Sequence, residues 1–400
     1  MHSLFEERGY NTVDFGQNAD IVVVNTCTVT AMADKKSRAA IRRAARTGKV
    51  IVAGCLAQKL AEKLLNIDGV AAVIGTDDRS RIVEVAEQLL EGQSHIDLTH
   101  SLAGCGFEPM RISSSGEKTR GIIKVQEGCN CYCSYCIIPY VRGSSRSRPF
   151  ADILAEAETL ANQGVKELVL TGIHIASYQD GGRGLGDVIT ALDTIGPRIR
   201  IGSIEPGMLD ENFVQQAAAS SKLCPHFHLS LQSGSATVLQ RMNRPYTPTE
   251  YLTFVTTLRE RFDNPAITTD VISGFPAETE AEHDETMGFV KQIGFSRLHV
   301  FPYSSREGTR AHELTPKVPK AVSRRRAAEL VALGEILEEN YIHGQLGNNA
   351  QVLFEEDSKQ FAGLFEGYSE RYIRVAAYAE KNEIKTVRLS DVRGLTAFGE

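Results

Sequence analysis

Between Gly121 and His343, β-type runs alternate with helical stretches more regularly than elsewhere in this chain of 400 residues. The predicted strands are Gly121–Gln126, Glu167–Thr171, Arg198–Ser203, His226–Leu231, Ala266–Ser273 and Ser296–Phe301. The predicted helices include Ala151–Gln163, Asp210–Ser220, Thr249–Arg261, Glu280–Ile293 and Val322–Tyr341. Such a succession of βα units predicts a partial or full βα barrel, whose functional site lies beyond the C-terminal strand ends.

The flanking regions differ from this barrel. Residues 1–102 also alternate strands with helices, which predicts a separate parallel α/β domain. Residues 103–118 contain Gly, Ser and Pro without periodicity and are expected to form a linker. Residues 344–400 contain predicted strands with no helices between them, which indicates a small all-β barrel; these strands are Ala350–Glu355, Phe361–Tyr368, Tyr372–Ala379 and Ile384–Leu389.

The composition excludes several classes of protein. Hydrophobic residues make up 42% and charged residues 24% of the chain, as in soluble globular proteins. No apolar run approaches the roughly 18 residues of a membrane span, and the N-terminus MHSLFEERGY lacks the apolar core of a signal peptide. We therefore expect a cytoplasmic protein. Because the net charge is −6, a nucleic acid would have to bind at local basic patches.

Cysteines are concentrated directly after the first barrel strand, in Gly-Cys129-Asn-Cys131-Tyr-Cys133-Ser-Tyr-Cys136. In a reducing compartment, such clustering indicates metal binding or catalysis. Structural zinc stays an alternative, although it would use a second, separated pair of ligands that this sequence lacks. Cys129, Cys133 and Cys136 form a Cys-x3-Cys-x2-Cys array. Three thiolates would ligate three irons of a four-iron cluster and leave the fourth iron open to a small molecule.

This array and the blocks that follow it resemble the radical S-adenosylmethionine (SAM) superfamily, and within it the methylthiotransferases that modify threonylcarbamoyladenosine in tRNA. The blocks are Pro139–Arg148, Leu170–His174, Arg200–Pro206, His228–Ser235, Asp270–Pro276 and Phe301–Ser304. The resemblance covers nearly the whole chain. It implies a flavodoxin-like methylthiotransferase N-terminal domain at 1–102, a partial βα radical SAM barrel at 119–343 and a TRAM barrel at 344–400.

The resemblance implies the addition of a methylthio group to carbon 2 of threonylcarbamoyladenosine, 3′ of the anticodon. Two alternatives stay open: a methylthiotransferase for isopentenyladenosine tRNA or a ribosomal-protein aspartate, and a non-catalytic iron–sulfur RNA-binding protein. Side-chain acids and bases do not replace an unactivated aromatic hydrogen, so cofactors must supply the reactivity. The implied cofactors are two [4Fe-4S] clusters and SAM. The implied partners are tRNA and a low-potential electron donor.

The resemblance also assigns residues to the cofactors. Cys129, Cys133 and Cys136 would hold the radical SAM cluster, and Cys131, which departs from the family pattern, is interpreted as a bystander. Glu205 and Gln232 have an alternative role, since each could cap buried backbone groups. The residues assigned to SAM are Tyr135, Thr171 and Gly172 near the methionine, Ser203 and Glu205 at the ribose, and Gln232, Phe301 and Tyr303 at the adenosine.

Cys27 and Cys55 each follow a predicted strand of the N-terminal domain. Because the carboxyl ends of parallel strands line one crevice, we expect the two thiols to face a shared ligand site; buried structural cysteines are the alternative. The family has a third such cysteine for an auxiliary four-iron cluster, and this sequence lacks its counterpart. We expect an N-terminus truncated by one strand, which leaves the auxiliary cluster an open question.

Contacts to tRNA are predicted from local charge. Arg142, Arg146 and Arg148 flank the cysteine loop and are expected to contact phosphates. The basic residues between Lys35 and Arg46, and those at Arg324–Arg326, are either further patches or solvated helix faces. In the C-terminal module, aromatic residues either stack on bases or form the core; these are Phe361, Phe365, Tyr368 and Tyr372.

Overall fold

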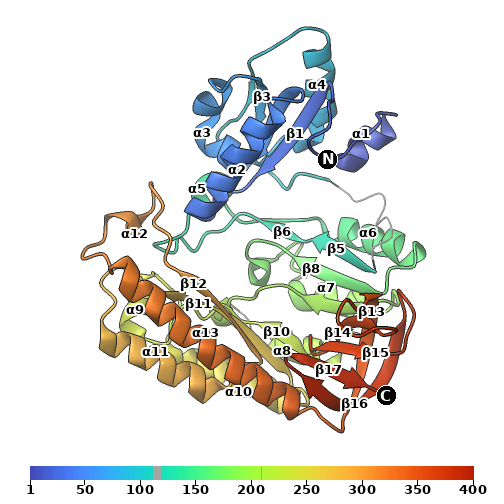
Figure 1. The fold of residues 1–400 in the computed structure, drawn as a ribbon, viewed down its shortest axis with the longest axis vertical. Helices are drawn as coiled ribbons and strands as arrows, with labels where there is room; N and C mark the ends of the chain where they lie inside the picture. Colours follow the sequence, from blue (N-terminus) through green and yellow to red (C-terminus); the bar gives the residue numbers. More distant parts are fainter. Residues whose placement is uncertain (111–118, 209) are drawn as a thin grey trace. The chain divides into compact units, whose positions relative to one another are not determined.

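The structure is a computed structural model that describes residues 1–110, 119–208 and 210–400 (Figure 1). Its chain divides into two compact units. Unit 1 comprises Met1–Ser114, Glu127–Arg146 and Ser304–Glu313, and unit 2 comprises Ser115–Gln126, Ser147–Tyr303 and Leu314–Glu400. Half of the predicted linker, residues 111–118, lies outside the described residues. In the described part of the chain, no helix combines the length and apolarity needed to cross a membrane.

Unit 1 contains a parallel sheet in the order β1-β2-β3-β4. Its strands are β1 (Ile21–Thr26), β2 (Lys49–Gly54), β3 (Val70–Ile74) and β4 (Ile96–Leu98). The helices are α1 (His2–Glu7), α2 (Ala31–Ala44), α3 (Cys55–Leu65) and α4 (Ile82–Leu90), with a 3-10 turn at Arg79–Arg81 before α4. The predicted parallel α/β arrangement is confirmed, and β4 is an additional strand.

The sheet of unit 1 is buried on both faces. Val50 and Val52 pack against α2 and α3, whereas the alternate residues Ile51 and Ala53 pack with the apolar side of α4. Side chains alternate between the two faces of a strand, so both sets of residues must be apolar. This explains why β2 reads as a continuous hydrophobic run rather than as an alternating one.

Unit 2 contains six parallel strands in chain order. They form the sheets β5-β8-β9 and β10-β11-β12, which are joined by parallel bridges between Ile199 and Leu223 and between Ile204 and Leu229. This confirms the predicted partial βα barrel. The strands are β5 (Arg120–Lys124), β8 (Glu167–Thr171), β9 (Arg198–Ile201), β10 (His226–His228), β11 (Ala266–Ser273) and β12 (Arg297–Pro302).

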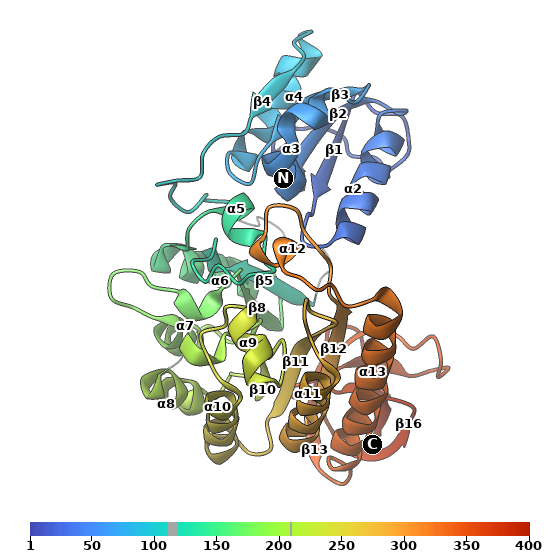
Figure 2. The ribbon, with the colours of Figure 1, turned by 90° about the vertical axis from the view of Figure 1, so that its left-hand side faces the viewer.

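Helices flank the barrel strands, and Figure 2 shows α10, α11 and α13 running alongside β11 and β12. Helix α11 starts with a reciprocal capping box between Thr279 and Glu282 and stops at Gly294, whose φ is 64°. These local signals fix both of its ends. The helices are α6 (Phe150–Asn162), α7 (Leu185–Leu192), α8 (Glu211–Ala219), α9 (Ala236–Arg241), α10 (Pro248–Arg261), α11 (Glu280–Ile293) and α13 (Lys320–His343), with 3-10 turns at Ile175–Ser177 and Pro206–Met208.

The C-terminal residues form a closed barrel in the order β13-β14-β15-β17-β16. Its strands are β13 (Asn349–Asp357), β14 (Phe365–Ser369), β15 (Arg374–Ala377), β16 (Ile384–Arg393) and β17 (Thr396–Gly399). The predicted small barrel is confirmed, but β14 begins at Phe365 rather than Phe361. A Cβ on Gly367 would lie 1.9 Å from the Leu353 carbonyl oxygen, so glycine permits this close strand pairing.

The aromatic residues of this barrel are engaged inside the protein. Phe361 packs edge-on against Phe398, with ring centroids 4.7 Å apart, and Tyr368 stacks on Tyr372 at 4.6 Å. Phe365 packs against the barrel core. These contacts support the core interpretation for Phe365, whereas the other three rings contact protein neighbours outside that core cluster.

A buried charge cluster joins the two barrels of unit 2, and we call it the arginine joint: Glu167, Arg120, Arg198 and Arg200. Glu167 accepts from Arg198 at 2.6 Å and from Arg200 at 3.0 Å, and it pairs with Arg120 at 3.2 Å. Arg198 donates to the Tyr368 carbonyl at 2.9 Å and Arg200 to the Ser369 carbonyl at 3.0 Å. The joint therefore fixes the C-terminal barrel to β8 and β9.

Candidate active site

The cysteine loop of unit 1 runs from Gly128 to Ile137. Gly128 has a φ of 73°, and a Cβ there would lie 1.9 Å from the Ser144 carbonyl oxygen, so the turn requires glycine. The Cys129 amide donates to the Gly143 carbonyl at 3.1 Å, and the Cys136 amide donates to the Cys133 carbonyl at 2.9 Å. Backbone bonds therefore hold the three cysteines on one compact loop.

The donor chemistry of this loop fits an iron–sulfur cluster. Thiolates are the ligands that such clusters use, and the backbone amide of Cys131 donates to the Cys129 sulfur at 3.4 Å. Hydrogen bonds to the sulfurs around such a cluster tune the reduction potential of the cluster. Cys133 is buried, whereas Cys129 and Cys136 are half-buried. The residues present therefore suit three ligands of one cluster, and the bystander role of Cys131 stays a prediction.

The second pair of thiols lies at one end of the parallel sheet in unit 1. Thr26 and Gly54 are register partners at the ends of β1 and β2, and Cys27 and Cys55 directly follow them. Helix α3 begins at Cys55 itself. Cys27 is exposed and Cys55 is buried. The register therefore brings both cysteines to the same sheet edge, where they offer two thiolate donors.

Arg142 connects the cysteine loop to this edge within unit 1. It lies at the end of helix α5 (Ile138–Arg142), where its Nε donates to the Cys55 sulfur at 3.2 Å and its Nη1 pairs with Glu127. Burial raises the pKa of the Cys55 thiol, and the Arg142 guanidinium opposes that rise. Arg142 thus acts inside unit 1, and Glu127 is a partner that the sequence did not reveal.

A third segment of unit 1, Ser304–Glu313, contacts both features. Arg306 is buried and donates to the Thr28 hydroxyl at 2.6 Å and to the Asp34 carboxylate at 2.8 Å. The Ala311 amide, in helix α12 (Arg310–Glu313), donates to the Ser134 carbonyl at 2.7 Å. This segment therefore tethers the cysteine loop to the edge that carries Cys27.

We expect Arg306→Met to loosen this tether. The substitution removes two hydrogen bonds from a charged, buried donor, so local opening should become easier by about 2 kcal/mol. Hydrogen–deuterium exchange of Ser304–Glu313 should accelerate, while exchange in helix α10 of unit 2 should not change. Unaltered protection of the segment would show that Arg306 does not hold it.

The residues assigned to SAM by resemblance follow the strand ends of unit 2, except Tyr135 in the cysteine loop. Thr171 is the last residue of β8, and its carbonyl accepts from Val125 at 2.8 Å. A Cβ on Gly172 would lie 2.8 Å from the Gln126 carbonyl oxygen, so glycine lets these two chain segments approach. Ser203 follows β9 and is exposed. These positions fit a ligand site at the C-terminal end of the barrel.

The remaining strand ends carry Glu205, Gln232, Phe301 and Tyr303. Glu205 is buried and pairs with Arg244; burial raises the pKa of its carboxyl, and Arg244 opposes the rise. Gln232 has a φ of 67°, and its backbone bonds to both Asp270 and Ile272 of β11. Phe301 is 49% exposed, and the Tyr303 ring packs against Phe275. Glu205 is therefore engaged by an arginine that the sequence did not reveal.

The expected phosphate contacts of Arg146 and Arg148 do not fit their burial. Arg148 is 2% exposed and pairs with Glu156, and Arg146 is 7% exposed, with its nearest carboxylate, that of Glu127, at 4.0 Å. Burying a charged side chain inside a folded protein is costly unless an internal group, such as these carboxylates, pairs with it. Arg142 is also engaged, as described above. In this structure Arg142 and Arg148 are therefore paired with internal carboxylates, and Arg146 is buried near Glu127.

Comparisons with known proteins agree with the site. The family model described as the radical SAM superfamily matches residues 123–290, and the model described as uncharacterized protein family UPF0004 matches residues 1–75. Among solved structures, the radical SAM methyltransferase TsrM from Kitasatospora setae superposes with a TM-score of 0.56 at 17% identity. The match covers 75% of this chain and 64% of TsrM, and shows a shared fold.

Sequence relatives are more specific. The threonylcarbamoyladenosine tRNA methylthiotransferase MtaB of Bacillus subtilis is 38% identical over 93% of this chain and 85% of that protein. The protein of the same name from Chlamydia pneumoniae is 35% identical over 98% and 91%. A tRNA-2-methylthio-N(6)-dimethylallyladenosine synthase of Oceanobacillus iheyensis is 32% identical over 93% and 74%. The chain therefore belongs to the radical SAM methylthiotransferases, in the MtaB family of threonylcarbamoyladenosine tRNA methylthiotransferases.

Proposed function

We propose that this chain adds a methylthio group to carbon 2 of threonylcarbamoyladenosine in the tRNA anticodon loop, 3′ of the anticodon. The observation that carries the proposal is the 38% identity with the Bacillus subtilis enzyme of that name across 93% of the chain. The three-cysteine loop supplies the donor set that this chemistry needs. The dimethylallyladenosine synthases are the second candidate, at 32% identity for the Oceanobacillus iheyensis protein.

The cofactors of the proposed reaction are SAM and [4Fe-4S] clusters. Cys129, Cys133 and Cys136 would hold one cluster, and the strand ends from Thr171 to Tyr303 would hold SAM. When bound, these groups supply the one-electron chemistry that replaces an aromatic hydrogen. The chain itself supplies placement. The Gly128 turn and the hydrogen bond from the Cys129 amide fix the thiolates, and Gly172 allows the chain after β8 to approach Gln126 closely.

The electrostatics of the site follow from its partners. Arg244 pairs with the buried Glu205 in the segment after β9, where a carboxyl oxygen could accept hydrogen bonds from ribose hydroxyls. Arg306 anchors the segment Ser304–Glu313, which follows β12, through its hydrogen bonds to Thr28 and Asp34 in unit 1. These groups orient ligands without themselves breaking bonds.

The proposal extends to the organisation of the chain. Residues 1–102 would form the flavodoxin-like methylthiotransferase N-terminal domain, 103–118 a linker, 119–343 the radical SAM core and 344–400 the TRAM domain. Cys27 and Cys55 would contribute ligands to the second cluster, on the sheet edge that Arg142 contacts. The reaction also requires a low-potential electron donor, and its tRNA substrate places the enzyme in the cytoplasm.

The proposal is tested with the anaerobically reconstituted chain, SAM, dithionite and synthetic anticodon stem-loops. One stem-loop carries threonylcarbamoyladenosine and a second carries dimethylallyladenosine. Nucleoside mass spectrometry should detect the 2-methylthio derivative of the first and none of the second. Modification of the dimethylallyl loop alone would favour the second candidate, and production of no 5′-deoxyadenosine would favour a non-catalytic binder.

A further inference from the structure

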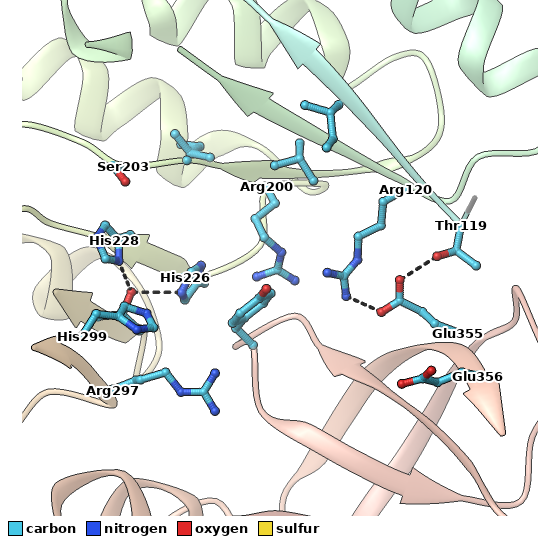
Figure 3. Close-up of a pocket in the computed structure, with 16 residues that line it drawn as sticks. Thr119, Arg120, Arg200, Ser203, His226, His228, Arg297, His299, Glu355 and Glu356 are labelled. Carbon is cyan, nitrogen blue, oxygen red and sulfur yellow. Dashed lines mark hydrogen bonds and ion pairs between the residues drawn. The ribbon is translucent and has the colours of Figure 1, made fainter. Parts of the chain in front are cut away.

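A cavity of about 810 Å³ lies inside the curved sheet of unit 2 (Figure 3). All six barrel strands contribute to its lining, and Glu355, Glu356 and Tyr372 of the C-terminal barrel line it at the N-terminal strand ends. At the other end it reaches Gly202 and Ser203, which follow β9. The cavity therefore continues inward from the strand ends to which the proposed function assigns SAM.

One wall of the cavity is a chain of hydrogen-bonding side chains on β10 and β11. We call its lining members, together with His299 of β12, the polar wall: His226, His228, Thr268 and His299; Asp270 of β11 pairs with His228 but does not itself line the cavity. His228 Nε2 lies 3.3 Å from the Asp270 carboxylate, and its Nδ1 lies 2.9 Å from the Thr268 hydroxyl. The same hydroxyl lies 3.3 Å from His226 Nε2. Figure 3 shows the two histidines meeting at this hydroxyl.

The chemistry of these groups fixes the direction of the bonds when the rings are neutral. A carboxylate only accepts, so His228 donates from Nε2 to Asp270 and accepts at Nδ1 from Thr268. Thr268 then accepts from His226 Nε2. This leaves His226 Nδ1 as a buried acceptor with no hydrogen-bond partner in the described part of the chain. A buried, unpaired acceptor of this kind is costly unless a ligand or water satisfies it.

His299 is the most accessible member of the polar wall. His299 is exposed, and its ring centroid lies 5.8 Å from that of His228. Its imidazole ring makes no hydrogen bond to any described residue. Burial lowers the pKa of both His226 and His299, so near neutral pH each ring offers one donor and one acceptor. His299 therefore has hydrogen-bonding capacity available inside the cavity.

Charged side chains of both signs surround the polar wall, including the lining carboxylates Glu355 and Glu356. Arg120, Arg200 and Arg297 all line the cavity, and each is paired with a carboxylate: the first two with Glu167 and Arg297 with Glu338. The cavity thus combines guanidinium groups with neutral imidazoles and a hydroxyl. This lining suits a substituent that carries several hydrogen-bonding groups.

We propose that the polar wall receives the threonylcarbamoyl substituent of the target adenosine and selects it over a dimethylallyl substituent. This inference rests on the proposed function. The threonylcarbamoyl group carries a urea, a hydroxyl and a carboxylate, whereas the dimethylallyl group carries only apolar carbons. A dimethylallyl group would bury the polar wall without hydrogen bonds, and sites built for hydrogen bonding reject such analogues strongly.

The dimensions are consistent with this placement. His299 lies two residues before Phe301, which the resemblance places at the adenosine of SAM, so it is about 7 Å deeper along the strand than that end of the SAM site. From N6 to the carboxylate carbon, the substituent spans four bonds, about 5 Å when extended. A target adenine held near the strand ends would therefore bring the carboxylate of its threonylcarbamoyl substituent close to His299.

The test measures the affinity of the reconstituted full chain for two fluorescent anticodon stem-loops by anisotropy. One carries threonylcarbamoyladenosine and the other dimethylallyladenosine, and selectivity is reported as the ratio of the Kd of the dimethylallyl loop to the Kd of the threonylcarbamoyl loop. His299→Leu and Thr268→Val should each reduce the ratio about tenfold by weakening the first loop, and His299→Gln should restore part of it. The matched control is His343→Leu, an exposed histidine at the end of α13, which should keep the ratio.

The outcomes separate the inference from the proposed function. If the parent chain methylthiolates the threonylcarbamoyl loop but both substitutions keep the parent ratio, the inference is wrong and the function stands. If the parent chain instead modifies the dimethylallyl loop, the proposed function is wrong and the inference falls with it. Melting temperatures equal to that of the parent confirm that the variants are folded.

Discussion

The Cys133→Ala variant is expected to form no 5′-deoxyadenosine from SAM in the presence of dithionite. The substitution removes one of three thiolates from the loop, and the remaining pair cannot retain a four-iron cluster with a single open iron. Cys133 is also the buried member of the set, so solvent cannot easily replace it as a ligand. The measurements are product chromatography and the iron content of the reconstituted chain.

A matched control lies in the same loop. Cys131→Ala should retain the parent rate, because Cys131 is interpreted as a bystander and its hydrogen bond to the Cys129 sulfur comes from the backbone amide. If Cys133→Ala cleaves SAM at the parent rate, this loop does not hold the catalytic cluster. If Cys131→Ala is inactive as well, the bystander interpretation is wrong.

The Glu167→Ala variant is expected to lose about 3–5 kcal/mol of unfolding free energy, the usual consequence of removing one partner from a buried ion pair. Glu167 is fully buried, and its removal leaves the guanidinium groups of Arg198 and Arg200 without their carboxylate. Urea denaturation followed by circular dichroism measures the loss. Glu84→Ala, which breaks an exposed pair with Arg81, should cost below about 1 kcal/mol.

The same residue predicts a pH dependence. Burial by itself would raise the pKa of Glu167, but Arg200, Arg198 and Arg120 outweigh it and lower the pKa to about 2 from its ordinary 4.5. The stabilisation is therefore complete above pH 4.5 and is lost as the pH falls towards 2. The difference in stability between the parent and Glu167→Gln should shrink across this window. A stability difference that stays constant across this window would show that the arginine joint does not lower the pKa of Glu167.

The sequence predicted the elements that carry long, periodic patterns or clear caps. Strand β11 and helix α11 have the predicted bounds, Ala266–Ser273 and Glu280–Ile293. Strands β4 and β17 were missed because segments of three and four residues are too short to show alternation. The start of β14 was placed too early because Phe361 is apolar for a different reason, its packing against Phe398.

The site residues likewise fall into those with a local sequence signal and those without one. The cysteine loop is contiguous, so its spacing shows its chemistry directly, and the strand ends predicted that Cys27 and Cys55 share one edge. Charge pairing is different, because the partners are far apart in sequence: Arg306 meets Asp34, and Arg244 meets Glu205. Arg148 was expected to contact tRNA. Its burial beside Glu156 could not be predicted, because this pairing has no local signature in the sequence.

The most direct test of the account is electron paramagnetic resonance of the reduced chain carrying Cys27→Ala and Cys55→Ala, with and without SAM. Only the three-cysteine loop can then hold a cluster, and we expect about four irons per chain and a signal that changes when SAM binds the open iron. A signal that SAM leaves unchanged, or a loop that retains zinc in place of iron, would contradict the account.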